Sequence, residues 1–332
     1  MNSNEKITMA HGSGGSSTRK LVQDLFHAYF KNDALDKMED AAVLDVPEGR
    51  IAYTTDSFVV TPIFFPGGDI GKLAVCGTLN DLLVMGAEPK YMTAGFIIEE
   101  GMDMLGLEAI VKSMAATSQD AGVGIVAGDT KVIEGHGGIY INTSGIGFIN
   151  QKPLHTSNVK PGDKVIISGA LGNHHACILS QRMNIKNTIN SDCAYLGDMV
   201  KNLAKEGIDI KTMRDVTRGG LATVLNEIAD SSGMSINLLE ENVPVDAEVK
   251  SFCGILGLDP LYMANEGKLV CFVGEKDAEK ALAIIRSSKY GDKASIIATV
   301  TKRENAPVMV KTRIGGVRIL NVLQGEGLPR IC

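Results

Sequence analysis

Five aspartates stand in short motifs that suit metal and phosphate chemistry. They are Asp40 in MEDAAVLD, Asp56 in TTDSF, Asp81 in LNDLL, Asp129 in AGDTKV and Asp215 in RDVTRGG. A carboxylate among apolar residues is costly to bury unless it is paired or bound to a metal. A set of oxygen ligands suits Mg²⁺ that carries the phosphates of a nucleotide. Each aspartate alone is typical of a turn or a helix cap, but together they predict a magnesium site.

A glycine-rich segment near the N-terminus, HGSGG at residues 11–15, precedes a helical pattern. Gly12 and Gly14 would let backbone N–H groups approach a phosphate closely, and a plain N-terminal loop is the alternative. No convincing strand precedes the segment, which disfavours a Rossmann dinucleotide site. GGDIGKL at residues 67–73 is not a P-loop, because its spacing is one residue short and Leu73 replaces the Ser or Thr that binds Mg²⁺.

Two further charged residues are candidates for phosphate and proton chemistry. Lys131 follows Asp129 by two residues, so both side chains share a face if the segment is a strand. A cation there would meet phosphate or a reacting amide; a surface ion pair is the alternative. Glu266, in MANEGKLV, follows a helical segment, where a carboxylate can act as a general base or simply face solvent.

The neighbours His174 and His175 point in different directions, which favours helix packing over a metal site.

The six cysteines stand at positions 76, 177, 193, 253, 271 and 332, without a CxxC or other zinc spacing. This distribution disfavours structural zinc and a disulfide framework, and most of the cysteines are expected to be buried reduced thiols. Cys332 differs because it is the last residue, after QGEGLPRI. Prenylation is excluded, since that signal places its cysteine four residues from the end. On composition alone the tail is typical of a frayed terminus.

The elements that position these residues predict an α+β fold in two domains. A chain of 332 residues exceeds the usual size of one hydrophobic core, and the polar, proline-containing segment at 151–161 marks the boundary. In the first half, helical patterns cover 21–30, 71–86 and 102–122, and strand patterns cover 41–46, 50–60, 91–98, 123–132 and 137–149. In the second half, helical patterns cover 173–182, 192–205, 219–232, 246–257 and 276–288, and strand patterns cover 164–168, 234–239, 268–274 and 294–301.

The composition is that of a folded soluble protein, with 44% hydrophobic and 22% charged residues. The formal charge is −6 and the Lys and Arg residues are scattered, so neither a nucleic-acid surface nor a membrane surface is expected. No apolar stretch approaches the roughly 18 residues of a membrane helix, and the N-terminus lacks the zones of a signal peptide. A cytoplasmic location is therefore expected.

Nine segments together resemble the HypE family of hydrogenase maturation proteins. They are HGSGG, EDAAVLD, TDSFVV, FFPGGDIGKLAVCGTLND, GFIIEEG, GDTKV, RDVTRGG, ANEGKLV and the terminal PRIC, and they span the chain. Several of these motifs also occur in the wider superfamily of aminoimidazole ribonucleotide synthetase, selenophosphate synthetase and thiamine-monophosphate kinase, whereas the PRIC ending is specific to HypE. The resemblance implies an N-terminal ATP-binding domain (1–155) that dimerises through a β-barrel-like interface, a C-terminal α/β sandwich domain (156–318) and a mobile tail (319–332).

The resemblance also implies an activity and its residues. In that family the terminal cysteine receives a carbamoyl group from the carbamoyltransferase HypF, and ATP-dependent dehydration converts it to a thiocyanate. The cyanide passes to iron on the HypC–HypD scaffold for [NiFe]-hydrogenase. The catalytic residues would be Lys131, Glu266 and the acceptor Cys332. The Mg²⁺ ligands would be Asp40, Asp56, Asp81 and Asp215, and the ATP-binding residues Gly12, Gly14, Asp56, Asn80, Asp81, Gly128, Asp129 and Thr130. One departure is NHHAC at 173–177, where the family pattern has glycine after a single histidine.

Two alternatives stay open on the sequence. A small-molecule kinase or synthetase of the same superfamily would use the acidic set without Cys332. A carrier that only presents a thiol to partner proteins would use Cys332 without Mg²⁺-dependent ATP binding.

Overall fold

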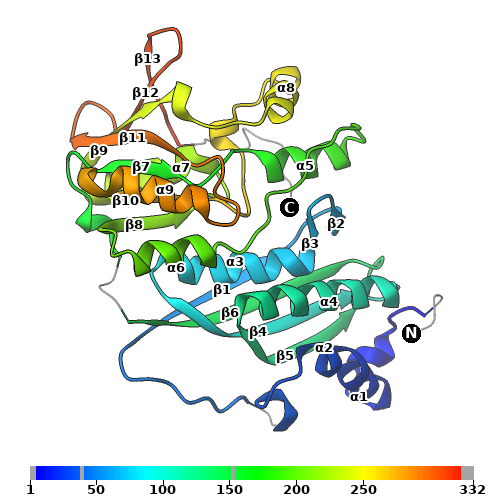
Figure 1. Cartoon of the computed structure of the whole chain (residues 1–332). Helices are drawn as coiled ribbons and strands as arrows, with labels where there is room; N and C mark the ends of the chain where they lie inside the picture. Colours follow the sequence, from blue (N-terminus) through cyan, green and yellow to red (C-terminus); the bar gives the residue numbers. More distant parts are fainter. Residues whose placement is uncertain (1–4, 38–40, 151–153, 323–332) are drawn as a thin grey trace.

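The computed structural model describes residues 5–37, 41–150 and 154–322. One sheet of four strands lies in the first half of the chain and one of seven strands in the second, and a small hairpin joins β2 (Phe64–Phe65) to β3 (Gly68–Asp69). Figure 1 shows the two sheets one above the other, with α3 (Ile70–Val84) and α6 (Gly197–Lys205) between them. The predicted α+β architecture in two parts is therefore confirmed.

The first sheet has the order β1-β6-β4-β5 and is open at both edges. Its strands are β1 (Arg50–Phe58), β4 (Glu88–Glu99), β5 (Gly124–Ile133) and β6 (Ile139–Ile149). β6 pairs antiparallel with β1 and β4, and β4 pairs parallel with β5. No closed barrel is formed within the described part of the chain. In the register, Asp56, Thr143, Ala94 and Gly128 follow one another across the four strands.

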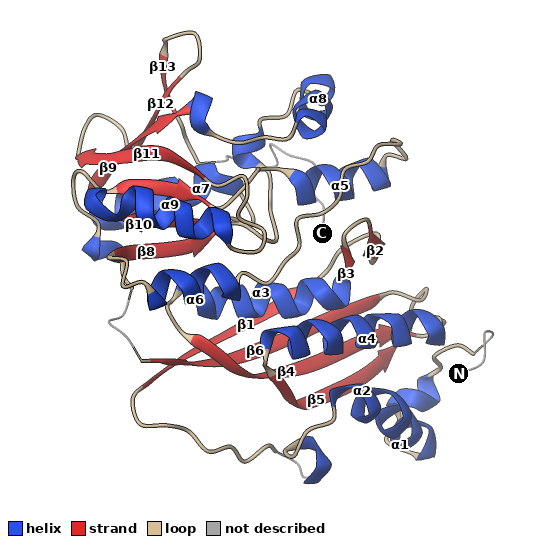
Figure 2. Ribbon diagram, in the orientation of Figure 1, coloured by secondary structure: helices blue, strands red, loops and turns tan. Residues whose placement is uncertain are grey.

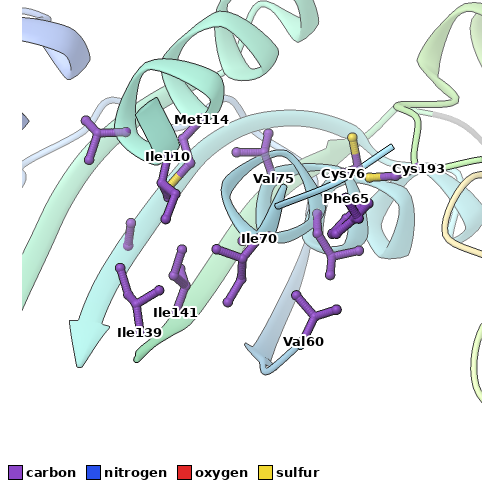
Figure 3. Packing of buried hydrophobic residues seen from close by; sticks show 14 of the residues in the cluster. Val60, Phe65, Ile70, Val75, Cys76, Ile110, Met114, Ile139, Ile141 and Cys193 are labelled. Atoms are coloured by element: carbon purple, nitrogen blue, oxygen red, sulfur yellow. The ribbon is translucent and has the colours of Figure 1, made fainter. Parts of the chain in front are cut away.

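Helices cover one face of this sheet (Figure 2). α3 and α4 (Met104–Ala121) pack on it through buried side chains such as Ile70, Ile110 and Met114 (Figure 3). α3 is apolar almost all round because it is enclosed by the first sheet on one side and by β8 (Ile210–Asp215) and α6 on the other. The opposite face of the sheet carries apolar side chains that no described element covers.

The N-terminal segment forms η1 (Met9–Gly12) and then a nearly continuous helix. Its parts are α1 (Ser16–Leu21), the π-helical η2 (Val22–His27) and α2 (Ala28–Phe30), and a short turn η3 (Leu35–Lys37) follows. Phe26 packs on Phe96 of β4, with ring centroids 4.7 Å apart. The strand predicted at 41–46 was wrong. Those residues form no ladder, and Val43 is 81% exposed, so an apolar alternation existed without a neighbouring strand to pair with.

The second sheet has the order β13-β12-β9-β11-β7-β10-β8. α7 (Gly220–Ser232) packs on one face, and α6 and α9 (Ala278–Ser287) pack on the other. The remaining strands are β7 (Lys164–Ile167), β9 (Met234–Leu239), β10 (Leu269–Val273), β11 (Ser295–Lys302), β12 (Val308–Lys311) and β13 (Val317–Ile319). The remaining helices are α5 (Asn173–Arg182), α8 (Ala247–Leu256) and the short turns η4 (Thr156–Asn158), η5 (Glu240–Asn242), η6 (Pro260–Tyr262) and η7 (Glu275–Asp277).

The sequence did not predict β8, β12 and β13. β8 has the sequence IKTMRD, in which only Thr212 and Met213 are buried. Its polar residues give no apolar pattern from which a strand could be predicted. Within the described ranges, no helix is both long and apolar enough to cross a membrane.

Candidate functional site

Four carboxylates come together where the two domains meet, and we call them the acidic cluster: Asp56, Asp81, Asp215 and Glu266. Asp56 lies on the α3-facing side of β1, and Asp81 lies on α3. Asp215 ends β8, opposite Leu269 of β10, and Glu266 lies in the bend just before β10. All four side chains are half-buried. The antiparallel pairing of β8 with β10 thus brings Asp215 and Glu266 to one edge of the second sheet, against α3.

The acidic cluster holds its protons more tightly than isolated carboxyl groups do. Burial, helped by the charges of Asp215 and Asp56, raises the pKa of Asp81 to about 7. Burial also raises the pKa of Asp56 and of Asp215. The pKa of Glu266 lies well above its usual range because of burial and the nearby charge of Asp192. Four carboxyl groups therefore share too little compensating positive charge.

Few donors inside the protein compensate this charge. The Thr54 hydroxyl donates to Asp81 Oδ2 at 2.8 Å, and the Thr78 hydroxyl lies 3.5 Å from Asp56 Oδ2. The guanidinium of Arg218 acts against the rise in the pKa of Asp56 and of Glu266. From the motif RDVTRGG only Asp215 was predicted to belong to the site, and Arg218, three residues later in the same motif, was missed.

The donor set fits a hard divalent cation. Carboxylate oxygens are the ligands that Mg²⁺ takes, and a cation would remove the repulsion that raises these pKa values. Among the described residues, no three His, Cys, Asp or Glu side chains already lie in metal-binding proximity. Asp40, the fourth predicted ligand, lies outside the described residues, as does Cys332.

Asp81→Asn should stabilise the ligand-free protein at high pH. The carboxyl of Asp81 binds more protons in the folded state than in the unfolded state between its ordinary pKa and about 7. Its contribution to the free energy of unfolding therefore falls as pH rises through that window. We expect the variant to melt about 2–4 °C higher than the wild type at pH 8, the shift that 1 kcal/mol produces. The melting temperatures should converge near pH 4. An unchanged or lower melting temperature at pH 8, measured in EDTA, would contradict the idea that the ionised Asp81 carboxylate destabilises the folded protein.

A second group of predicted residues lies on the other edge of the first sheet, and we call it the β5 group: Gly12, Gly14, Gly128, Asp129, Thr130 and Lys131. Lys131 Nζ lies 3.2 Å from Asp129 Oδ2, and both side chains are more than half exposed. This is the surface ion pair that the sequence left open as the alternative.

Two glycines of the β5 group, Gly12 and Gly128, are required by close packing, and Gly14 is favoured by its backbone conformation. A Cβ on Gly128 would lie 2.6 Å from the carbonyl oxygen of Ala94. A Cβ on Gly12 would lie 2.7 Å from the backbone nitrogen of Val132, so the HGSGG segment is fastened to β5. Gly14 has a φ of +81°, in the left-handed region.

Within a single chain, the acidic cluster and the β5 group lie on opposite edges of the first sheet. Asp56 and Gly128 lie in one register row, with β6 and β4 between them. Three inter-strand spacings amount to about 14 Å. Lys131 lies three residues beyond Gly128 on β5, so its side chain is on the opposite face of the sheet from that of Asp56.

Asn80, which the resemblance implies as an ATP-binding residue, bonds to the protein backbone in this structure. Its amide nitrogen donates to the carbonyl of Ala194 at 2.9 Å, and its oxygen accepts from the N–H of Leu196 at 3.0 Å. Asn80 is 3% exposed, so the side chain fastens α3 to the segment before α6. Its amide is thereby occupied by the protein backbone.

The predictions of helix packing for His174 and His175 and of buried thiols for the five described cysteines are confirmed. His174 and His175 are buried in the first turn of α5, and His174 Nδ1 lies 2.8 Å from the Ser191 hydroxyl. Burial lowers the pKa of His174 to about 4, so its ring is neutral. The five described cysteines are free and buried. Two of them, Cys76 of α3 and Cys193, lie side by side at the domain boundary (Figure 3).

A buried ion pair that the sequence did not single out holds the Glu266 bend. Asp192 Oδ1 accepts from the backbone N–H of Glu266 at 3.1 Å, and Asp192 Oδ2 lies 3.2 Å from Lys268 Nζ. Both side chains are less than one-tenth exposed, and Lys268 also donates to the carbonyl of Gly267. The backbone that carries Glu266 is thus fixed at both ends of the bend. Lys268 lies in the quoted segment ANEGKLV, which was the only signal for it.

Comparison with known proteins assigns both halves of the chain. Residues 38–149 match the family "AIR synthase related protein, N-terminal domain", and residues 160–311 match its C-terminal domain. The carbamoyl dehydratase HypE of Rhodobacter capsulatus is 45% identical over 99% of this chain and 98% of its own length. The Escherichia coli K12 protein of the same name is 44% identical over 98% of this chain and 99% of its own.

Solved structures show the same relationship. A hydrogenase maturation protein HypE in complex with ATP superposes with a TM-score of 0.94 at 46% identity, covering 98% of this chain and 99% of that one. A HypE chain from a HypE–HypF complex has a TM-score of 0.79 at 48% identity, covering 91% of this chain and 99% of that one.

Proposed function

The chain belongs to the HypE family of hydrogenase maturation proteins, and from that membership we propose that it is an ATP-dependent carbamoyl dehydratase that acts on its own Cys332. The observation that carries the proposal is the acidic cluster, which includes Glu266, in a chain 45% identical over nearly its full length to a protein named carbamoyl dehydratase. The matched ranges 38–149 and 160–311 support domains at 1–155 and 156–318, with 319–332 as the tail that carries the acceptor.

The reaction removes the elements of water from an S-carbamoyl group. Cys332 bears –S–C(=O)–NH₂, and the product is –S–C≡N. ATP transfers its γ-phosphoryl group to the carbamoyl oxygen, so the products also include ADP and a phosphate that carries this oxygen. Both protons on nitrogen must depart while the carbon–oxygen bond breaks. A base beside the nitrogen and positive charge beside the phosphates are therefore the two requirements of the site. The thiocyanate then supplies cyanide for hydrogenase iron.

Glu266 is suited to be the base. Burial and neighbouring carboxylates raise its pKa, and a carboxylate with a raised pKa is a stronger proton acceptor. The bend that carries it is held by Asp192 and Lys268, so its carboxyl has a fixed position. Mg²⁺ bound by Asp56, Asp81, Asp215 and Asp40 would neutralise the phosphates of ATP.

Lys131 would join this site from a second copy of the chain. The uncovered face of the first sheet exposes Ile51, Tyr53 and Ile97, which are 59%, 66% and 42% exposed. An apolar sheet face of this kind is stabilised by packing on another element. A homodimer formed through this face would let the β5 group of one chain, with Asp129, Thr130 and Lys131, approach the acidic cluster of the other.

Two protein partners follow from the proposed chemistry. A solved relative is described as a HypE–HypF complex, which supports HypF as the source of the carbamoyl group. The HypC–HypD complex would receive the cyanide. An acceptor on the chain's own C-terminus suits both transfers, because the same sulfur can visit the site and then a partner.

Removing Cys332 distinguishes this function from that of a small-molecule kinase or synthetase. With Cys332→Ala, we expect no carbamoyl-dependent release of phosphate from Mg-ATP, because the substrate is gone. Binding of Mg-ATP, measured by calorimetry, should be unchanged, since no described ATP-site candidate is altered. Retained turnover with a small substrate would favour the kinase alternative. Absence of any Mg²⁺-dependent ATP affinity in the wild type would favour a carrier.

A further inference from the structure

A cavity of about 660 Å³ lies between the two domains and has no part in the proposed reaction. Its walls come from the end of α3, the start of β4, the segment at 154–160, α6 and the start of β8. None of its lining residues belongs to the acidic cluster or to the β5 group. Its volume falls in the range of small-molecule sites, which often lie at domain interfaces.

The charge around this cavity is positive although the chain as a whole carries −6. Five lysines line it (Lys90, Lys160, Lys201, Lys205 and Lys211), against two carboxylates, Glu88 and Asp209. Lys211 is paired with Asp209. The other four lysines form no ion pair with any described residue. Charges of one sign around a concave site attract ligands of the opposite sign.

The inner wall of the cavity is largely apolar and includes the Tyr195 side chain. Leu83, Phe148, Leu154 and Val200 supply hydrocarbon surface. The ring of Tyr195 also lines it, and burial, helped by the charge of Glu88, raises the pKa of Tyr195 to about 12. Its hydroxyl therefore stays protonated and can donate a hydrogen bond. A Cβ on Gly197 would lie 2.3 Å from the Tyr195 ring, so glycine there lets the ring pack against the start of α6.

We propose that this cavity binds a small organic anion, in which a phosphate, sulfonate or carboxylate group is attached to an apolar, ring-bearing body. The lysines at the rim take the acidic group, and the wall of Phe148, Leu154 and Val200 takes the body. A bare inorganic anion would leave this wall unfilled, and a neutral aromatic compound would gain nothing from the lysines. The inference is independent of the dehydratase proposal because the two sites share no residue.

The test uses 8-anilino-1-naphthalenesulfonate, a sulfonate on an aromatic body whose fluorescence rises on transfer to an apolar site. We expect the full chain to bind the dye saturably, with one site per chain. The double variant Lys201→Glu, Lys205→Glu should weaken that binding about tenfold or more, because two attractive charges become repulsive. Both lysines are exposed, so the variant should fold as the wild type does.

Controls separate this cavity from other surfaces. Lys186→Glu with Lys250→Glu makes the same change in net charge at exposed positions outside the cavity and should leave dye affinity unaltered. Excess Mg-ATP should not displace the dye. The neutral N-phenyl-1-naphthylamine should bind about tenfold more weakly, with no response to the lysine changes. Equal affinity of the dye for the wild type and the Lys201, Lys205 variant would overturn the proposal, as would displacement by Mg-ATP to the same extent in both proteins.

Discussion

Glu266→Gln should slow conversion of the carbamoylated chain to its thiocyanate by about a thousandfold, within the range that loss of a general base produces. Glutamine keeps the size of the side chain, and the backbone N–H of residue 266 can still donate to Asp192. The glutamine amide cannot accept a proton near neutral pH. Carbamoylation of Cys332 and binding of Mg-ATP should be unaffected. The conversion is followed in a single turnover by mass spectrometry of the C-terminal peptide.

The matched control for Glu266→Gln is Glu279→Gln. Glu279 is an exposed carboxylate on α9, and it is not among the carboxylates of the acidic cluster. The control should convert at the wild-type rate. If Glu266→Gln also did so, Glu266 would not be the base, and the raised pKa of its carboxyl would reflect only its buried position.

Mixed dimers should reveal that each site is built from two chains. A heterodimer of one Lys131→Ala chain and one Glu266→Gln chain has one site that contains both intact residues, so we expect about half the wild-type rate. Each homodimeric variant should be close to inactive. The heterodimer is obtained by co-expressing chains with different affinity tags, and the rate is the conversion of S-carbamoyl to thiocyanate.

The reciprocal heterodimer gives the opposite result. In this heterodimer, one chain carries both Lys131→Ala and Glu266→Gln and the other is wild type. Each shared site then lacks one of the two residues, so the heterodimer should be almost inactive. If Lys131 and Glu266 acted within one chain, this second heterodimer would retain half the rate and the first would have none. The roughly 14 Å between the acidic cluster and the β5 group predicts the shared arrangement.

Several elements lie where the sequence predicts them. α5 has the predicted bounds, 173–182, although its two adjacent histidines suggested a metal site at first sight. The prediction failed for β8, in which four of the six residues are polar or charged, and for 41–46, which has a strand pattern but no partner. Both errors concern interactions between segments far apart in sequence, which local patterns do not encode.

The candidate site was predictable in its residue types but not in its geometry. Asp56, Asp81, Asp215 and Glu266 were singled out separately, and the fold brings them together at the domain boundary. The distance to Lys131 depends on strand order, which the sequence does not state. Asp192 was missed because its position beside Glu266 arises only from the fold.

The mass of the C-terminal peptide after carbamoylation and addition of Mg-ATP shows whether Cys332 carries the reacting group. We expect the peptide containing Cys332 to lose the mass of one water, at a rate matched by release of one phosphate per chain. A carbamoylated peptide whose mass stays constant while Mg-ATP is bound, or a loss of mass at a residue other than Cys332, would contradict this expectation.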